Sequence, residues 1–253
     1  MTSRRAAALA TVVALLCFAA SAAADAPAGL AVPAEGPASR PGSGSLVPKP
    51  SAPDPRPFTL EDRYLDAAQR GDLKMIQLCL DKGVDPKTKD SIGRSALLLA
   101  AREAKNLEVV KFLHDKGLAA DEPDATGRSP LADAAGNGDV TIVSWLIEQK
   151  ADLERKDAQG RTPIFGAAIG GSAPTVARLI EAGAKVNVRD NYEDTPLIDA
   201  CNKGNDEVAR LLVEKGADPS LKDQEGRTAR ERAPETAKYC RSLGEAKPPP
   251  AAL

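Results

Sequence analysis

The sequence has few aromatic residues, a single histidine and no excess of positive charge. Only 3% of its 253 residues are aromatic, and one of these is the sole Trp, so a large aromatic core is not available. The formal net charge is −2 at pH 7, which provides no basic surface for attraction to a phosphate backbone. We therefore expect no nucleic-acid partner.

Residue patterns typical of enzymes are missing as well. No two Cys or His residues have the spacing of zinc ligands, and neither a Walker phosphate loop nor a dinucleotide-binding glycine motif is present. His114 follows Phe112 and Leu113 near the end of an expected helix, where we interpret it as a partly exposed residue and not as a general base. We predict a protein that is not an enzyme and has no catalytic residues, metal or cofactor.

No apolar stretch reaches the roughly 20 residues that a membrane-spanning helix requires. The run from Ala6 to Ala20 follows Arg4 and Arg5 and precedes small residues at 22–24, which is the order of parts in a secretory signal peptide. We predict that residues 1–24 are this signal and that the protein is exported to a bacterial periplasm, without stable membrane insertion after cleavage. Secretion and an uncleaved N-terminal anchor are the alternatives.

Residues 25–57 are dense in Pro, Ala, Gly and Ser and show no apolar periodicity. Such a segment buries too little apolar surface to offset the entropy of ordering, and its prolines keep it extended. We predict a disordered linker here and a disordered tail at residues 245–253.

What the sequence does contain is a repeated phrase, best seen as "GRTPIFGAAIGG" at residues 160–171. Similar phrases begin at Gly93, Gly127, Glu193 and Gly226, so the starts are separated by 34, 33, 33 and 33 residues. Self-similarity at one period of this length indicates a stack of repeated supersecondary units.

Each part of the phrase has a structural reason. Gly160 can adopt the positive φ of a tight turn, Thr162 can cap a helix with its hydroxyl, and Pro163 suits the first helical position. After a glycine stop comes a second segment, such as residues 205–216, in which apolar residues recur every three or four positions. Each unit is therefore predicted to be a turn, a short helix, a second turn, a longer helix and an outward loop.

The 33-residue period, with heads such as Thr162-Pro163-Ile164 and Thr195-Pro196-Leu197, resembles the ankyrin repeat family. The resemblance implies an all-α solenoid of about six helix-turn-helix units with projecting β-turn loops. It covers residues 58–244, with units at about 58–89, 90–123, 124–156, 157–189, 190–222 and 223–244. The first and last units carry polar residues, among them Arg230 and Arg232, as expected of units with a neighbour on one side only.

The sequence departs from the family pattern in two ways. The family's His in Thr-Pro-Leu-His is replaced in successive units by Leu98, Ala132, Phe165, Ile198 and Glu231. The second unit also has one extra residue in "AAREAKN", which predicts a small bulge between its two helices.

Three cysteines follow the predicted signal: Cys79, Cys201 and Cys240. We interpret all three as small buried residues. A disulfide between Cys201 and Cys240, which lie in adjacent units, is the alternative for those two. Cys79 is too many units away to pair with either.

The resemblance places partner contacts on the concave face, which is lined by the loop tips and the short helices. Arg and Tyr are frequent at binding hot spots, and an exposed apolar patch often marks an interface. The candidate binding residues are Arg94, Arg128, Arg161, Phe165, Ile169, Tyr192, Asp194 and Arg227. As alternatives, the arginines pair with the turn aspartates Asp90, Asp124, Asp157 and Asp223, and Phe165 packs between helices. Trp145, on the apolar stripe of a longer helix, is predicted to lie in the core.

Together with the predicted signal peptide and the missing catalytic pattern, the resemblance predicts a monomeric, exported scaffold that binds another protein through its concave face. An inhibitor or immunity-type protein that binds one toxin or enzyme is an alternative. An accessory factor of a periplasmic enzyme is another. Function is grafted onto folds of this kind, so the fold by itself does not choose among these roles.

Overall fold

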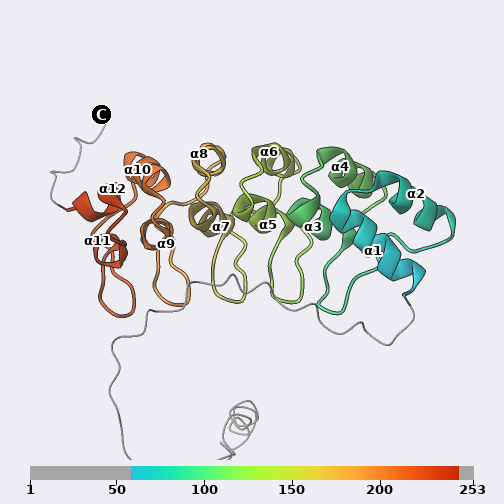
Figure 1. The fold of residues 1–253 in the computed structure, drawn as a ribbon, viewed down its shortest axis with the longest axis horizontal. Helices are drawn as coiled ribbons and strands as arrows, with labels where there is room; N and C mark the ends of the chain where they lie inside the picture. Colours follow the sequence, from blue (N-terminus) through green and yellow to red (C-terminus); the bar gives the residue numbers. More distant parts are fainter. Residues whose placement is uncertain (1–57, 245–253) are drawn as a thin grey trace, which may run out of the picture. The chain divides into compact units, whose positions relative to one another are not determined.

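The computed structural model describes residues 58–244, which form a row of stacked helix pairs (Figure 1). The predicted signal peptide at 1–24, linker at 25–57 and tail at 245–253 lie outside the described residues. Within residues 58–244 the regular structure is helical, apart from two isolated antiparallel bridges. The predicted all-α solenoid of six units is confirmed.

The helices alternate between an inner and an outer row, and each unit contributes one helix to each row (Figure 1). The inner helices are α1 (Leu60–Arg70), α3 (Ala96–Leu99), α5 (Pro130–Gly136), α7 (Pro163–Gly170), α9 (Pro196–Lys203) and α11 (Ala229–Arg232). The outer helices are α2 (Leu73–Asp81), α4 (Leu107–Asp115), α6 (Val140–Glu148), α8 (Ala173–Glu181), α10 (Asp206–Glu214) and α12 (Lys238–Ser242).

Buried side chains between adjacent units form one continuous apolar cluster that runs from Tyr64 to Leu243. The Ala-Ala pairs of the inner helices, such as Ala167 and Ala168 in α7, are fully buried, and their small size allows neighbouring helices to approach. Trp145 of α6 is also buried, as predicted. Since each fully buried Leu, Ile or Val stabilises by about 1.5–3 kcal/mol, the apolar contacts between neighbouring units are a major source of the folding free energy.

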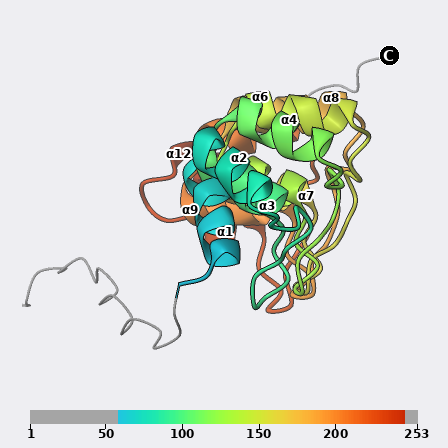
Figure 2. The same ribbon diagram turned by 90° about the vertical axis from the view of Figure 1, so that its right-hand side faces the viewer.

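The loop that precedes each inner helix from α3 to α11 projects from the helix rows, and we call these loops the fingers (Figure 2). The fingers comprise residues 84–95, 118–129, 151–162, 184–195 and 217–228. In the third finger, Asp157 Oδ1 accepts from the backbone N–H groups of Gln159 at 2.9 Å and Arg161 at 3.0 Å. Gly160 closes the turn with a φ of 78°, and its N–H donates to the Asp157 carbonyl at 2.8 Å.

Neighbouring finger tips are joined to each other by backbone hydrogen bonds. The N–H of Ala158 donates to the Thr126 carbonyl at 2.8 Å, and the N–H of Asn191 donates to the Gln159 carbonyl at 2.9 Å. The same bond recurs from Ala125 to Ile92 at 3.0 Å. The fingers therefore form a hydrogen-bonded row, which holds their side chains in fixed positions beside the inner helices.

The extra residue of the second unit is accommodated at the end of α3, where Ala100–Ala104 form a π-helical segment, η1. Lys105 then adopts a left-handed conformation with a φ of 46°. Asn137 of the next unit donates its side-chain amide N–H to the Arg102 carbonyl. The predicted bulge is confirmed, and a π-helical turn is a common way to absorb one inserted residue.

The backbones of α5 and α7 touch through glycines. A Cβ atom added at Gly166 would lie 2.9 Å from the Ala132 carbonyl oxygen, and one added at Gly170 would overlap the Gly136 carbonyl oxygen. Helices that carry larger side chains pack at axial distances of about 8–10 Å. The repeat pattern predicts only a glycine stop after each short helix, and this close contact between units three and four was not predicted.

Gly170→Ala is expected to destabilise the protein although alanine favours helices. Alanine is better than glycine by about 0.8–1.0 kcal/mol in a helix interior, but overpacking costs typically about 1–3 kcal/mol. Gly136→Ala is the matched control, because its added Cβ would meet only ordinary contacts, with Arg128 Nη2 at 3.5 Å as the nearest atom. Thermal unfolding should show a lower midpoint for Gly170→Ala alone, and equal midpoints for the two variants would contradict the close contact.

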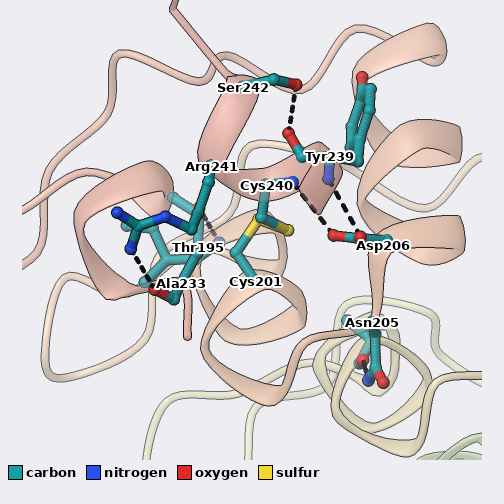
Figure 3. The surroundings of a disulfide bond; sticks show 11 residues. Thr195, Cys201, Asn205, Asp206, Ala233, Tyr239, Cys240, Arg241 and Ser242 are labelled. Carbon is teal, nitrogen blue, oxygen red and sulfur yellow. Dashed lines mark hydrogen bonds between the residues drawn. A yellow bond between two sulfur atoms is a disulfide. The ribbon is translucent and has the colours of Figure 1, made fainter. Parts of the chain in front are cut away.

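Cys79 is buried, as predicted, whereas Cys201 and Cys240 form a disulfide (Figure 3). The interpretation of the latter two as unpaired buried thiols is wrong, and the alternative is confirmed. Their Cα atoms lie 5.4 Å apart, within the usual range for the bond. The disulfide ties α12 to α9, and Asp206 adds hydrogen bonds from the backbone N–H groups of Tyr239 at 3.0 Å and Cys240 at 3.1 Å.

Removal of the disulfide by a Cys201→Ala and Cys240→Ala double substitution is expected to destabilise the last two units by about 3–4 kcal/mol. The estimate follows from the entropy of closing a loop of this length in the unfolded chain, with a sequence separation of 39 residues. Urea unfolding with and without reductant measures it. Reductant should lower the midpoint of the wild type and leave that of the double variant unchanged, with Cys79→Ala as the control that keeps the disulfide.

Candidate protein-binding groove

Three of the four predicted finger arginines pair with the aspartate that opens their own turn. The Nε–Oδ2 distance is 2.6 Å for Arg94 and Asp90 and 3.0 Å for Arg227 and Asp223. Arg161 contacts Asp157 through Nη2 at 3.1 Å. The alternative reading of the arginines, as partners of the turn aspartates, is therefore correct for these three, and their additional use in binding stays a prediction.

Arg128 differs from the other three, because it pairs with Asp133 of α5 and not with Asp124. Asp133 is only 2% exposed, and its Oδ2 atom has no hydrogen-bond partner among the described residues. Burial raises the pKa of Asp133, and the nearby charge of Arg128 opposes that rise. The sequence did not predict that Arg128 pairs with Asp133, because nothing in the repeat pattern distinguishes Asp133 from the turn aspartates as a partner for this arginine.

The predicted exposed patch of Phe165, Ile169 and Tyr192 does not exist. Phe165 is 0% exposed and belongs to the core, so the prediction that it contacts a partner is wrong. It stands in α7 where the family has a polar His, and the apolar surroundings between units favour burial. Tyr192 is 57% exposed at its finger tip, and Ile169 is half-buried.

The fourth finger has Asp194 at the position that carries arginine in the other four. Asp194 was predicted on the binding surface, but it is only 7% exposed, and Arg232 Nη2 of α11 lies 3.5 Å from its Oδ2. Its Oδ1 has no hydrogen-bond partner among the described residues. Asp190 Oδ1 of the same finger accepts from the N–H groups of Tyr192 at 2.8 Å and Asp194 at 3.0 Å, and no arginine among the described residues forms an ion pair with Asp190, because Arg189 pairs with Glu193.

A groove of about 200 Å³ lies between units three and four. The missing side chains of the glycines in α5 and α7 leave this space open, and two finger arginines border it. Its lining residues are Arg128, Ala132, Gly136, Asn137, Asp157, Arg161, Thr162, Gly166, Ile169 and Gly170. Pockets for small molecules measure about 300–1,000 Å³, so this groove suits a single side chain of a larger partner better than a free ligand.

Thr162, in the lining of the groove, has a hydroxyl without a partner. At the equivalent positions Ser95, Ser129 and Thr195 cap their helices, and Thr195 Oγ1 accepts from the Ile198 N–H at 3.3 Å. The N–H of Phe165 donates instead to the Thr162 carbonyl at 3.0 Å. Thr162 is 2% exposed and its Oγ1 has no hydrogen bond among the described residues, so the predicted cap is wrong at this one unit.

Asp199 of α9 lies near the groove on the side of unit five. It is the equivalent, one repeat later, of Gly166 in the groove lining, and α9 packs against α7. Its carboxylate makes no hydrogen bond or ion pair with another described residue. Burial and the charges of Asp194 and Asp190 raise the pKa of Asp199 to about 6, against the opposing charges of Arg161 and Arg232.

A family model for ankyrin repeats, in three copies, matches residues 65–157 and 153–223. The chain belongs to the ankyrin repeat family. Ankyrin repeats are generally modules for protein–protein interaction and are typically non-catalytic. No curated protein matches the chain.

Two further findings concern the part of this ankyrin repeat protein that the structure describes. None of the helices within residues 58–244 has the length and apolar character needed to cross a bilayer. His114 is half-buried near the end of α4, as predicted, with its Nδ1 2.9 Å from the Leu118 carbonyl and its ring edge-on to Trp145.

Asp199→Asn is expected to stabilise the ankyrin repeats at pH 7 and to have little effect at pH 4. The folded pKa of Asp199 is raised, so the folded state binds its proton more tightly between about pH 4 and 6. The stability contributed by this group is thus present below about pH 4 and is lost as pH rises through 6. At 1.36 kcal/mol per pKa unit, reduced for partial exposure, the gain at pH 7 is on the order of 1–2 kcal/mol.

Urea unfolding at the two pH values measures the effect of Asp199→Asn. Glu207→Gln is the matched control, since it removes the same charge from the exposed surface of α10 in the same unit. If Asp199→Asn changes the free energy of unfolding relative to the wild type by the same amount at pH 4 and pH 7, the raised pKa of Asp199 is contradicted.

Proposed function

We propose that this ankyrin repeat protein is an exported scaffold that binds another protein through its inner face. We define the inner face as the surface formed by the inner helices and the adjacent side of the fingers. The observation that carries the proposal is the groove between α5 and α7, because it is an open concavity of the inner face that two finger arginines border. The exposed ring of Tyr192, one finger further along, adds a residue type that is frequent at binding hot spots.

The fixed geometry of the inner face favours a binding role. The finger tips are hydrogen-bonded to one another, and the finger arginines are held by their aspartates, so few side chains lose freedom when a partner binds. Binding then loses less entropy, which raises the affinity for a given contact area. The titratable side chains in the groove lining are Arg128, Asp157 and Arg161, and none of these is a nucleophile placed beside a general base. We therefore propose a non-enzymatic role.

Export to the periplasm is part of the same proposal. It rests on the signal-peptide pattern of residues 1–24 together with the Cys201–Cys240 disulfide, since structural disulfides persist mainly in oxidising compartments. The test is to separate the cytoplasmic and exported fractions of cells and to measure, in each fraction, whether Cys201 and Cys240 are reduced or joined by the disulfide. A protein found reduced and in the cytoplasm would contradict this part of the proposal and leave the binding face untouched.

Ile169→Ala and Tyr192→Ala are each expected to lower the affinity for the partner by about tenfold, because removal of a hot-spot side chain costs more than 1 kcal/mol. The partner is first isolated by affinity capture with the wild-type protein from the exported fraction, and it is then titrated with each variant. Circular dichroism confirms that each variant keeps its helical content.

Leu78→Ala is the control for these two variants, because Leu78 is an exposed apolar residue on α2 in the outer row. It should leave the affinity unchanged. If Leu78→Ala weakens binding while Ile169→Ala and Tyr192→Ala do not, the partner binds the outer row and the inner face is not the binding surface.

A further inference from the structure

This inference rests on the proposed function, in which a partner protein binds the inner face. The chemistry of the residues around the groove indicates which kind of partner side chain fits there. Several buried oxygen atoms in units three to five have no hydrogen-bond donor among the described residues. They are Thr162 Oγ1 in the groove lining, Asp133 Oδ2 on α5 and Asp194 Oδ1 in the fourth finger. A buried polar atom without a partner costs about 1–3 kcal/mol, so a ligand that donates hydrogen bonds would recover this free energy.

The position of Gly166 makes this region accessible. Gly166 of α7 is the equivalent of Asp133 one unit earlier and of Asp199 one unit later, and α7 lies between α5 and α9 in the inner row (Figure 1). The absence of a side chain at Gly166 therefore leaves a gap between two carboxylates on neighbouring helices. Asp199 lies on α9, which packs against α7, and Thr162 and Ile169 of the groove lining belong to the N-cap and the body of α7.

Within residues 58–244 no cation forms an ion pair with Asp199. Arg128 pairs with Asp133, and Arg161 pairs with Asp157. Arg232 Nη1 contacts Asp223 at 2.9 Å, and its Nη2 lies 3.5 Å from Asp194. Arg128, Arg161 and Arg232 are thus each paired with another carboxylate, and among the described residues Asp199 and Asp190 have no paired cation.

We propose that the groove binds a basic side chain, arginine or lysine, that projects from an extended segment of the partner protein. The aliphatic stem of that side chain lies over Gly166 and Ile169, and its head group donates to the oxygen atoms of Thr162 and Asp199. Arginine offers five N–H donors and lysine three, which matches a site with open acceptors and uncompensated negative charge. An acidic side chain would meet the same carboxylates with like charge.

The probe for this proposal is a display library of random linear peptides, panned at pH 7 against the full-length chain. Enriched peptides are expected to share one Arg or Lys at a fixed position. Replacement of that residue by Gln in a synthetic peptide should weaken binding in calorimetry by roughly tenfold to a hundredfold, as expected for a hydrogen bond to a charged group.

Two variants of the protein test the two acceptors. Asp199→Asn should weaken binding of the basic peptide by a similar factor and should not change binding of its Gln counterpart. Thr162→Val should weaken the basic peptide by a smaller factor without lowering the melting temperature, because its hydroxyl caps no helix. The controls are Glu207→Gln on α10 and Thr195→Val, whose hydroxyl does cap a helix, and both should leave the affinity unchanged.

Three outcomes would overturn the proposal. The first is a set of enriched peptides that lack a common basic residue. The second is a basic peptide that binds Asp199→Asn and the wild-type protein with the same affinity. If such peptides still lose affinity with Ile169→Ala and Tyr192→Ala, the inner face binds protein segments through other chemistry and the proposed function stands. A library that yields no peptide sensitive to inner-face variants counts against both the basic side chain and the proposed function.

Discussion

The burial of apolar side chains between adjacent units is the interaction on which the rest of this structure depends. Each unit is a short helix, a longer helix and a finger, and its buried residues face a neighbouring unit because two such helices cannot enclose a core by themselves. The Ala-Ala pairs allow the inner helices to approach, and Asn205 of unit five donates to the Ala168 and Ile169 carbonyls at the end of α7, at 2.8 and 3.1 Å. Stacking therefore places the fingers in a row and creates the inner face.

Identical units would give a uniform surface, so the differences between units decide where a partner can bind. Glycines at three positions of the α5–α7 contact bring two backbones together and open the groove beside them. In the next unit, Asp194 replaces the finger arginine and faces inward. Because of these two departures, a space of one side chain's size lies close to the carboxylates of unit five, and we propose that the two features together recognise one basic side chain.

Stability and binding make different demands on the same residues. Burial raises the pKa of Asp199 and Asp194, which shows that their charged forms are disfavoured in the folded protein. The Thr162 hydroxyl is likewise buried without a partner among the described residues. In the next unit, by contrast, the Thr195 hydroxyl accepts a hydrogen bond from the Ile198 N–H and so caps α9. Local rules of this kind are commonly broken at functional sites, where the cost is recovered when a ligand binds.

The sequence by itself determined the architecture, because a 33-residue period, helix caps and glycine stops are local signals that each unit repeats. It also predicted the extra residue of unit two as a bulge, and Trp145 and Cys79 as buried. Only the tertiary structure decided the details of the candidate site. Phe165 proved to be buried, Arg128 proved to pair with Asp133, and Cys201 proved to be bonded to Cys240. These outcomes depend on which side chains from different units meet, and contacts across units leave no periodic signal in the chain.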